Sequence, residues 1–229
     1  MTMTATYQVK KFSWSYSPLK NYETCPKRHY HYDIAKDIQG DSESEPIREG
    51  KQMHAAFDAR LRAGTPLPLG LGHYEPMLVR ILAAPGHTYS ERKLALSSNY
   101  QPVAWFSAEA WFRGILDCTK INGRTASVFD WKNGKPSHDT TQLQLSAALV
   151  FHSAPAIQQV RAGLVFANHD KVESATFERR DLPEIWNEIL PRVRRLQRAR
   201  EAQEYPPKPS GLCRRWCGVV SCPYHGIGG

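Results

Sequence analysis

The sequence has no apolar run of about 18 residues, the length that a membrane-spanning helix requires. Its first residues, MTMTATYQVKKF, lack the apolar stretch of a secretory signal. It also has no internal repeat and no GxxxxGK[ST] motif, which excludes a repeat architecture and translocation driven by a P-loop ATPase. We therefore expect no membrane association and a cytoplasmic location, in a bacterial cytoplasm or an infected host cell.

The composition is that of an ordinary globular protein. With 229 residues, 41% hydrophobic and 23% charged, the chain is long enough for one sizeable core, and we expect a single domain over residues 1–229. The formal net charge of +8 favours a polyanionic partner such as DNA, although a solvated basic helix face explains it equally well. Its arginines cluster late: Arg179, Arg180, Arg192, Arg194, Arg195, Arg198 and Arg200.

Cysteine is scarce and unevenly distributed. There are five cysteines, an odd number, and in a chain without a secretory signal a cluster of them favours a metal over disulfides. Cys118 is expected to be a core residue. The other four suit either a [4Fe–4S] cluster or a structural Zn²⁺ that joins the two chain ends, with reduced structural thiols as the alternative. These four are Cys25, Cys213, Cys217 and Cys222.

The stretch Phe112–Lys132 predicts a two-stranded hairpin. Its centre, Asn122-Gly123, is a strong turn signal because both residues tolerate the positive φ of a type I′ turn. Side chains alternate along a strand, so we expect Asp117, Asp130 and Lys132 to share one face. In this register Asp117 and Asp130 are diagonal neighbours with backbones roughly 7–8 Å apart. Two carboxylates at that spacing can share a divalent cation, although a simple pair of surface acids is the alternative.

The remaining periodicities predict helices that alternate with a meandering sheet, which indicates a mixed α/β (α+β) domain. The polar segment 40–45, GDSESE, is expected to be a loop, and Pro191 is expected to kink or split the last helix. Helices are predicted from Ser17-Pro18, over 46–63, 74–83 and 141–152, and from a capping box at 181–184. Strands are predicted from 91, and over 103–112, 160–167 and 172–177.

Several short motifs between residues 17 and 223 follow one another in the order found in the RecB-like branch of the PD-(D/E)XK nucleases, which the chain therefore resembles. The resemblance implies a central mixed sheet flanked by helices and a restriction-endonuclease-like core. It also implies a small cysteine-clasped lobe, formed by residues 1–45 and 205–229. The matching motifs are Ser17-x-Leu19-x-x-Tyr22-x-x-Cys25-Pro26, Gly50-x-x-x-His54, Glu91, Gly114-Ile115-Leu116-Asp117, Asp130-Trp131-Lys132-x-Gly134-Lys135, Gln142-Leu143 and the late cysteine triplet.

The resemblance implies a hydrolytic metal site. Asp117 and Asp130 would bind Mg²⁺ or Mn²⁺, and His54 would also reach the metal, which favours tolerance of Mn²⁺. Such a metal lowers the pKa of a bound water and acts as a Lewis acid. Lys132 would orient or deprotonate the water, or neutralise developing charge. Without the resemblance, His54 is an inward-facing core histidine and Lys132 a surface lysine.

Two further positions and the nature of the cysteine site stay open. Gln142 either steadies the site, contacts DNA or caps its own helix, and Glu91 is either catalytic or a charge at a strand end. The resemblance favours [4Fe–4S], but the spacing C-x3-C-x4-C departs from the family's commoner C-x2-C start. Structural Zn²⁺ therefore remains an alternative, with His225 as a spare ligand. Ser146 stands where the family often has tyrosine, and Trp131 replaces the usual tyrosine between the acid and the lysine.

The resemblance thus predicts a metal-dependent DNA nuclease, an exonuclease on single strands or DNA ends, in repair, recombination or phage DNA processing. The alternative is a nucleic-acid-binding or assembly module with an inactive or regulated nuclease site. An oligomer, or a helicase or recombination partner, is compatible with either prediction, but the residues identify no interface.

Overall fold

The computed structural model describes residues 11–38, 45–136 and 140–227, so most of the predicted loop at 40–45 lies outside the described residues. The helices are α1 (Tyr16–Thr24), α2 (Pro26–His29), α3 (Glu45–Ala63), α4 (Glu75–Ala83), α5 (Thr141–Ser153) and α6 (Leu182–Ala202). The strands are β1 (His87–Leu96), β2 (Pro102–Val103), β3 (Phe112–Asn122), β4 (Thr125–Lys132), β5 (Gln159–Phe166) and β6 (Lys171–Glu178). A π-helical segment, η1 (Tyr30–Ala35), follows α2, and four short 3₁₀ turns are η2 (Gly72–Tyr74), η3 (Ala167–His169), η4 (Arg179–Asp181) and η5 (Gly211–Cys213).

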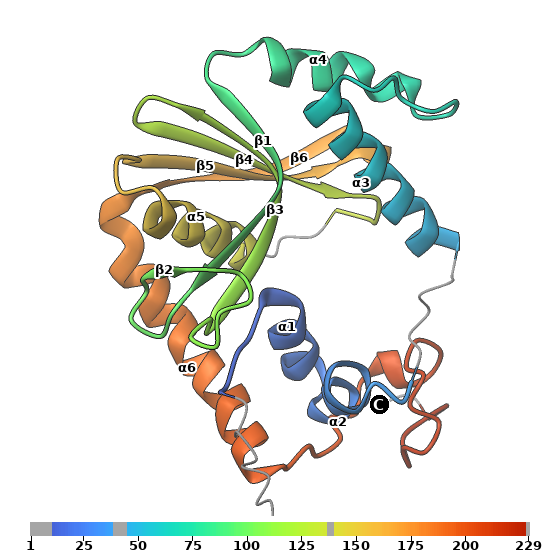
Figure 1. Cartoon of the computed structure of the whole chain (residues 1–229). Coiled ribbons are helices and arrows are strands. Elements are labelled where there is room, and N and C mark those ends of the chain that lie inside the picture. The colour runs from blue at the N-terminus through green and yellow to red at the C-terminus, as the bar shows by residue number, and fades with distance from the viewer. Residues whose placement is uncertain (1–10, 39–44, 137–139, 228–229) are drawn as a thin grey trace, which may run out of the picture.

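The six strands form one mixed sheet in the order β2-β1-β3-β4-β5-β6. All neighbouring pairs are antiparallel except β4 and β5, which are parallel and joined through α5. Helices flank both faces of the sheet (Figure 1), which confirms the predicted mixed α/β architecture. Within the described ranges, none of the helices combines the length and the apolar character that crossing a membrane requires.

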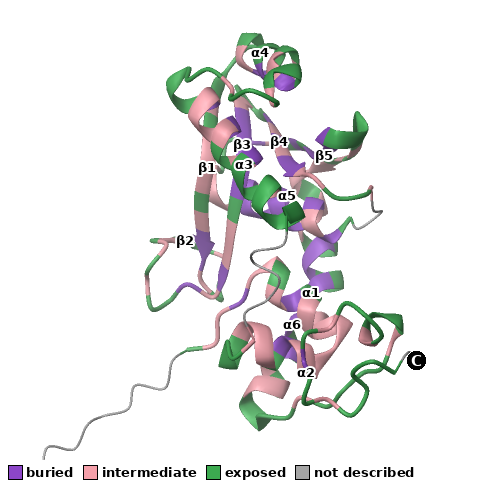
Figure 2. Cartoon of the chain, turned by 90° about the vertical axis from the view of Figure 1, so that its right-hand side faces the viewer, coloured by how far each residue is buried: buried purple, intermediate pink, exposed green. Residues whose placement is uncertain are grey.

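Two hydrophobic cores lie on opposite faces of the sheet. The larger core packs α5 and α6 against residues such as Leu116 and Val128, and the smaller core packs α3 and α4 against residues such as Cys118 and Trp131. Figure 2 shows the buried residues gathered around the sheet and its helices, while the C-terminal segment is mostly exposed. Burial of Cys118 is as predicted, and it raises the pKa of that thiol to about 12.

The hairpin between β3 and β4 has a different turn from the predicted one. Asn122 pairs with Thr125 as part of the strands, so the loop consists of Gly123 and Arg124. Gly123 has φ +56 and Asn122 does not lie in the positive-φ region. The predicted turn at Asn122-Gly123 is therefore wrong by one residue. Continuing the observed register brings Asp117 directly across from Asp130, instead of diagonal to it.

The strand predicted over 103–112 is also wrong, and so is the position of the capping box before the last helix. The stretch 103–112 is not one strand, because 104–111 forms turns in which the Ser107 backbone N–H bonds to the Ala104 carbonyl and the Ala110 N–H bonds to the Ser107 carbonyl. The last helix is not split, since α6 continues through Pro191. Its predicted capping box is displaced to η4, where the side chains of Glu178 and Asp181 cap each other's backbone.

The helix α5 lies very close to β3. A Cβ atom at Gly114 would lie 2.4 Å from Cδ1 of Leu149, so a side chain at Gly114 would collide with this helix. Leu149 is itself buried in the larger core. The glycine thus allows the helix that begins next to Asp130 to press against the central strand.

We expect Leu149→Ala to lower the free energy of unfolding by about 2–5 kcal/mol, because it removes buried methyl groups and leaves a cavity against Gly114. Urea unfolding followed by circular dichroism measures the change. Leu69→Ala is the matched control, since Leu69 is fully exposed and its loss should change stability by less than about 0.5 kcal/mol. Equal effects of the two substitutions would contradict the packing described.

Candidate active site

Glu91 and Asp117 mark a break in the side-chain alternation of β1 and β3. Leu116 contributes to the core beneath α5, whereas Cys118, two residues later, contributes to the core beneath α3. The two strands pair on either side of these residues, between Ser90 and Cys118 and between Arg92 and Leu116. Glu91 has φ +49, a conformation that costs a non-glycine residue on the order of 1 kcal/mol or more. The strict alternation that predicted Asp117 on the face of Asp130 therefore fails at this point.

His54 is positioned by α3, whose residues Met53, Phe57 and Leu61 are buried in the smaller core. Its Nε2 lies 2.9 Å from the carbonyl oxygen of Trp131, and its Nδ1 lies 3.4 Å from Oδ2 of Asp117. Because a carbonyl oxygen only accepts, Nε2 donates the hydrogen, and the lone pair of the neutral ring is on Nδ1. A metal-binding histidine is normally oriented in this way, with its second nitrogen hydrogen-bonded to a backbone carbonyl.

His54, Glu91 and Asp117 bring one ligand atom each within 4.8 Å of one another. Burial raises the pKa of Glu91, and the charge of Asp117 raises it further. For His54, burial opposes protonation, but the hydrogen bond and charge of Asp117 outweigh it and raise the pKa. Two carboxylates and one imidazole held together at this distance fit a divalent cation, which would offset their mutual repulsion.

Asp130 lies beside this group but outside it, on the side of α5. Its Oδ1 accepts a hydrogen bond of 2.6 Å from Nε2 of Gln142, and its Oδ2 lies 2.6 Å from Nζ of Lys132. Burial raises the pKa of Asp130 to about 6; Lys132 opposes this shift and the charge of Asp117 adds to it. Asp130, Lys132 and Gln142 therefore form a second polar unit, next to the three potential ligands.

The start of α5 is held from outside by an ion pair that the sequence did not reveal. Arg192 on α6 donates from Nη1 to Oγ1 of Thr141 at 2.8 Å, and from Nε and Nη2 to the two carboxylate oxygens of Glu23 at 2.7 Å each. Thr141 directly precedes Gln142. From the sequence, Arg192 is only one member of a basic cluster, because its partner Glu23 is 169 positions away in the chain.

The backbone of Trp131 is a second feature that the sequence did not reveal. Its N–H donates to Oδ2 of Asp117 at 2.8 Å, while its carbonyl accepts from His54. The indole ring packs in the smaller core against Phe57 of α3 and Phe129, with ring centroids 5.3 and 6.0 Å away. A sequence motif specifies side chains, so it cannot indicate these hydrogen bonds of the Trp131 backbone.

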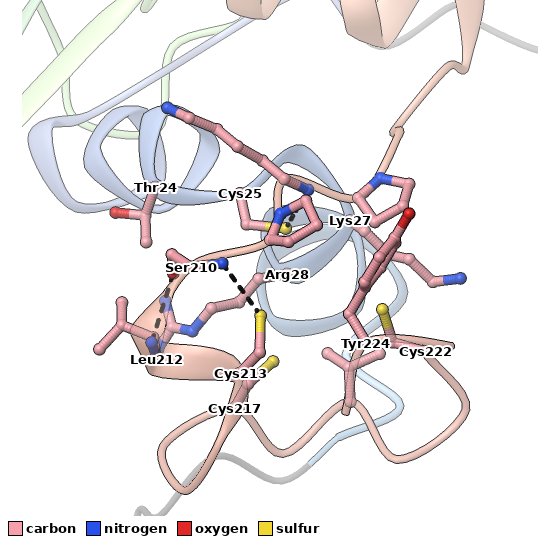
Figure 3. A pocket seen from close by; sticks show the side chains of 14 residues that line it. Thr24, Cys25, Lys27, Arg28, Ser210, Leu212, Cys213, Cys217, Cys222 and Tyr224 are labelled. Atoms are coloured by element: carbon pink, nitrogen blue, oxygen red, sulfur yellow. Dashed lines mark hydrogen bonds between the residues drawn. The ribbon is translucent and has the colours of Figure 1, made fainter. Parts of the chain in front are cut away.

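The four non-core cysteines line one cavity, formed where the C-terminal segment meets α1 and α2 (Figure 3). The backbone N–H of Lys208 donates to Sγ of Cys25 at 3.3 Å, and that of Ser210 donates to Sγ of Cys213 at 3.4 Å. Among the described residues, no three sulfur atoms lie within 4.8 Å of one another. The chain ends therefore meet around Cys25, Cys213, Cys217 and Cys222 without the close sulfur packing of a single-ion site.

One solved structure among those compared supports this fold. The crystal structure named "Putative exonuclease" from Eubacterium rectale has a TM-score of 0.51 and 12% identity, covering 93% of this chain and 91% of that chain. The crystal structure of SSO0001 has a TM-score of 0.48 and 12% identity, covering 96% and 90%. No curated protein matches.

The family comparison covers nearly the whole chain. A family model described as "PD-(D/E)XK nuclease superfamily" matches residues 13–227, and the mixed sheet with its flanking helices agrees with that assignment. The chain therefore belongs to the PD-(D/E)XK nuclease superfamily and has the restriction-endonuclease-like core that its sequence predicted.

Proposed function

We propose that this nuclease is a metal-dependent deoxyribonuclease of the RecB-like branch, which removes nucleotides from single strands or DNA ends. The observation that supports it best is the convergence of His54, Glu91 and Asp117 within 4.8 Å, next to the ion pair of Asp130 and Lys132. Phosphodiester hydrolysis needs an activated water and a cationic environment for the phosphate, and these residues provide the groups for both.

His54 and Asp117 would hold a divalent cation together with Glu91, and Asp130, which lies beside this group, is an additional ligand candidate. A bound Mg²⁺ or Mn²⁺ would lower the pKa of a water and stabilise charge on the phosphate. Oxygen ligands suit both ions, and the imidazole favours Mn²⁺. The hydrogen bond from Nε2 of His54 to the Trp131 carbonyl keeps the lone pair of Nδ1 directed at the carboxylates.

Lys132 would act on the substrate from beside these ligands. Its side chain is 32% exposed, while that of Asp130 is only 12% exposed, so the ammonium group is the member of the pair that a phosphate can approach. Gln142 and Lys132 bind the two oxygens of the Asp130 carboxylate, and this carboxylate thereby orients the lysine. A fixed ammonium there would neutralise charge that develops on the phosphate, whereas the neutral amine would accept a proton from the attacking water.

DNA as substrate is supported by the charge of the molecule. The net charge is +8, and several arginines of α6, including Arg194 and Arg198, are exposed. An exonuclease mode is in line with the name of the Eubacterium rectale protein of similar fold. We place the activity in DNA repair, recombination or phage DNA processing, in a bacterial cytoplasm or an infected host cell.

We further propose that residues 1–45 and 205–229 form one lobe that binds a [4Fe–4S] cluster through Cys25, Cys213, Cys217 and Cys222. A closed tetrahedral zinc site would bring the sulfurs about 3.8 Å apart, given Zn–S bonds of about 2.3 Å. A cluster of several atoms holds its thiolates farther apart, so it does not require three of these sulfurs within 4.8 Å of one another. The backbone donors to two of the sulfurs, and Lys27, Arg28 and Lys208 in the lining, would stabilise its negative charge.

We expect Asp117→Asn to lower the rate of DNA cleavage by on the order of a thousandfold, because it removes a charged ligand worth several kcal/mol of transition-state stabilisation. The assay follows 5′- and 3′-labelled single and double strands with Mg²⁺, Mn²⁺ or EDTA. The matched control is Glu184→Gln, an exposed carboxylate of α6. Tight binding by the wild-type protein without cleavage in any metal would instead support the binding-module alternative.

Glu91→Gln tests whether Glu91 is a ligand. The substitution keeps the size of the side chain but removes its charge, so we expect the affinity for Mn²⁺ to fall by about tenfold or more. Calorimetric titration of the DNA-free protein with Mn²⁺ measures this without any cleavage. An unchanged affinity, with Asp117→Asn as the positive comparison, would reduce Glu91 to a charge at the β1–β3 break.

Serine substitutions test the cluster. Cys213→Ser should abolish the brown absorption and the bound iron of anaerobically purified protein, whereas Cys118→Ser should retain both, because Cys118 is buried away from the cavity. Visible absorption and elemental analysis give the result. Colourless wild-type protein that contains zinc would refute the [4Fe–4S] proposal in favour of a structural zinc site.

A further inference from the structure

A wide groove lies near the end of α6, away from the candidate active site. It is bounded by residues 11–13, by the segment 27–36 of α2 and η1, and by residues 200–205 at and beyond the end of α6. In Figure 1 this region is near the bottom, where α6 ends below α1 and α2. None of the six candidate catalytic residues lines it. The groove is therefore separate from the site described above.

The size of the groove favours an extended ligand. Its volume is about 1580 Å³, and pockets that enclose small molecules usually measure roughly 300–1,000 Å³. A segment of a polymer fits such a space better than a single metabolite does.

The charges in the groove favour an anionic ligand. Four of its residues are cations, Lys11, Lys27, Lys36 and Arg200, against the two acids Asp33 and Glu201. Both acids already accept hydrogen bonds, Asp33 from His29 and Asn21, and Glu201 from Gln197. Within the described parts of the chain, the three lysines have no ion-pair partner. The uncompensated charge at this surface is thus positive.

Aromatic rings lie between these cations. Tyr30 and Tyr205 both line the groove, with ring centroids 5.1 Å apart and planes at 34°. Tyr30 is 37% exposed, so part of its ring is accessible from the groove. Lysines interleaved with accessible aromatic rings are the features with which proteins bind single strands, by phosphate contacts and base stacking.

We propose that this groove binds single-stranded nucleic acid, with phosphates on Lys11, Lys27 and Lys36 and a base stacked on Tyr30. The proposal rests on the proposed function and deepens it, because it gives the nuclease a second contact with its substrate outside the catalytic residues. A stacked base distinguishes a single strand from a duplex, whose bases are already paired and stacked.

The lysines are tested with the double variant Lys11→Ala/Lys36→Ala. Its affinity for an oligothymidylate long enough to span groove and active site is measured with EDTA, at several salt concentrations. We expect weaker binding and a salt slope reduced by about 1.4, which corresponds to two phosphate contacts at about 0.7 each. The matched control, Arg80→Ala/Arg124→Ala, removes two exposed cations on α4 and at the β3–β4 turn and should leave the slope unchanged.

The stacking contact is tested with Tyr30→Ala and an abasic strand of the same length. We expect the variant to bind oligothymidylate about tenfold more weakly and the abasic strand as tightly as the wild type does, while Tyr30→Phe retains both affinities. A purely structural role would weaken binding of both strands equally. That result, an unchanged salt slope for the lysine variant, or an equal loss of affinity for duplex DNA would overturn the proposal.

Cleavage by the wild-type protein with Mn²⁺ is measured in parallel, so that the two proposals fail separately. If the wild type cleaves DNA but the groove variants bind like it, the groove inference is overturned and the nuclease assignment stands. If the groove variants lose affinity as expected but no metal supports cleavage, the groove inference stands and the proposed function fails.

Discussion

The arrangement of the site depends on the separation of β4 from β3 at the end of their hairpin. Pairing between the two strands ends at Cys118 and Phe129, whereas β3 continues beside β1 and β4 continues beside β5. The backbone of Trp131 therefore bonds to side chains: its N–H to Asp117 and its carbonyl to His54. The indole ring of Trp131 is buried in the core beneath α3 and anchors this backbone. One residue thus fixes two potential metal ligands from two different elements.

The electrostatics of the site follow from this separation of β3 and β4. Glu91, Asp117 and Asp130 are brought together with limited access to solvent, and burial raises the pKa values of Glu91 and Asp130. The cationic groups at hand are Lys132, paired with Asp130, and His54, whose pKa Asp117 raises. The positive φ of Glu91 costs conformational energy, and this strained residue adds a carboxylate to the site. Such concentrated, partly uncompensated negative charge is expected where a cation is to be bound.

The sequence could predict the residues of the site better than their geometry. Motif order pointed to Asp117, Asp130 and Lys132 as candidates and to four cysteines that line one cavity, and periodicity predicted most helices within a few residues. The turn was misplaced because Asn122 and Gly123 both tolerate positive φ, and only the packed strands decide which of them turns. The break at Glu91 and Asp117 reverses the alternation on which the face assignment relied. Backbone contacts of Trp131 and the distant pair of Glu23 and Arg192 have no local signal.

The helix α1 connects the candidate active site to the cysteine cavity. Glu23 binds Arg192, which also holds Thr141, the residue before Gln142. Cys25 follows Glu23 by two positions and lines the cavity, and Nζ of Lys208 donates to the Glu23 carbonyl. The end of α1 and the Glu23–Arg192 ion pair therefore link the cavity to the start of α5. Since Gln142 bonds directly to Asp130, a continuous series of contacts runs from the cysteine cavity to the Asp130–Lys132 pair.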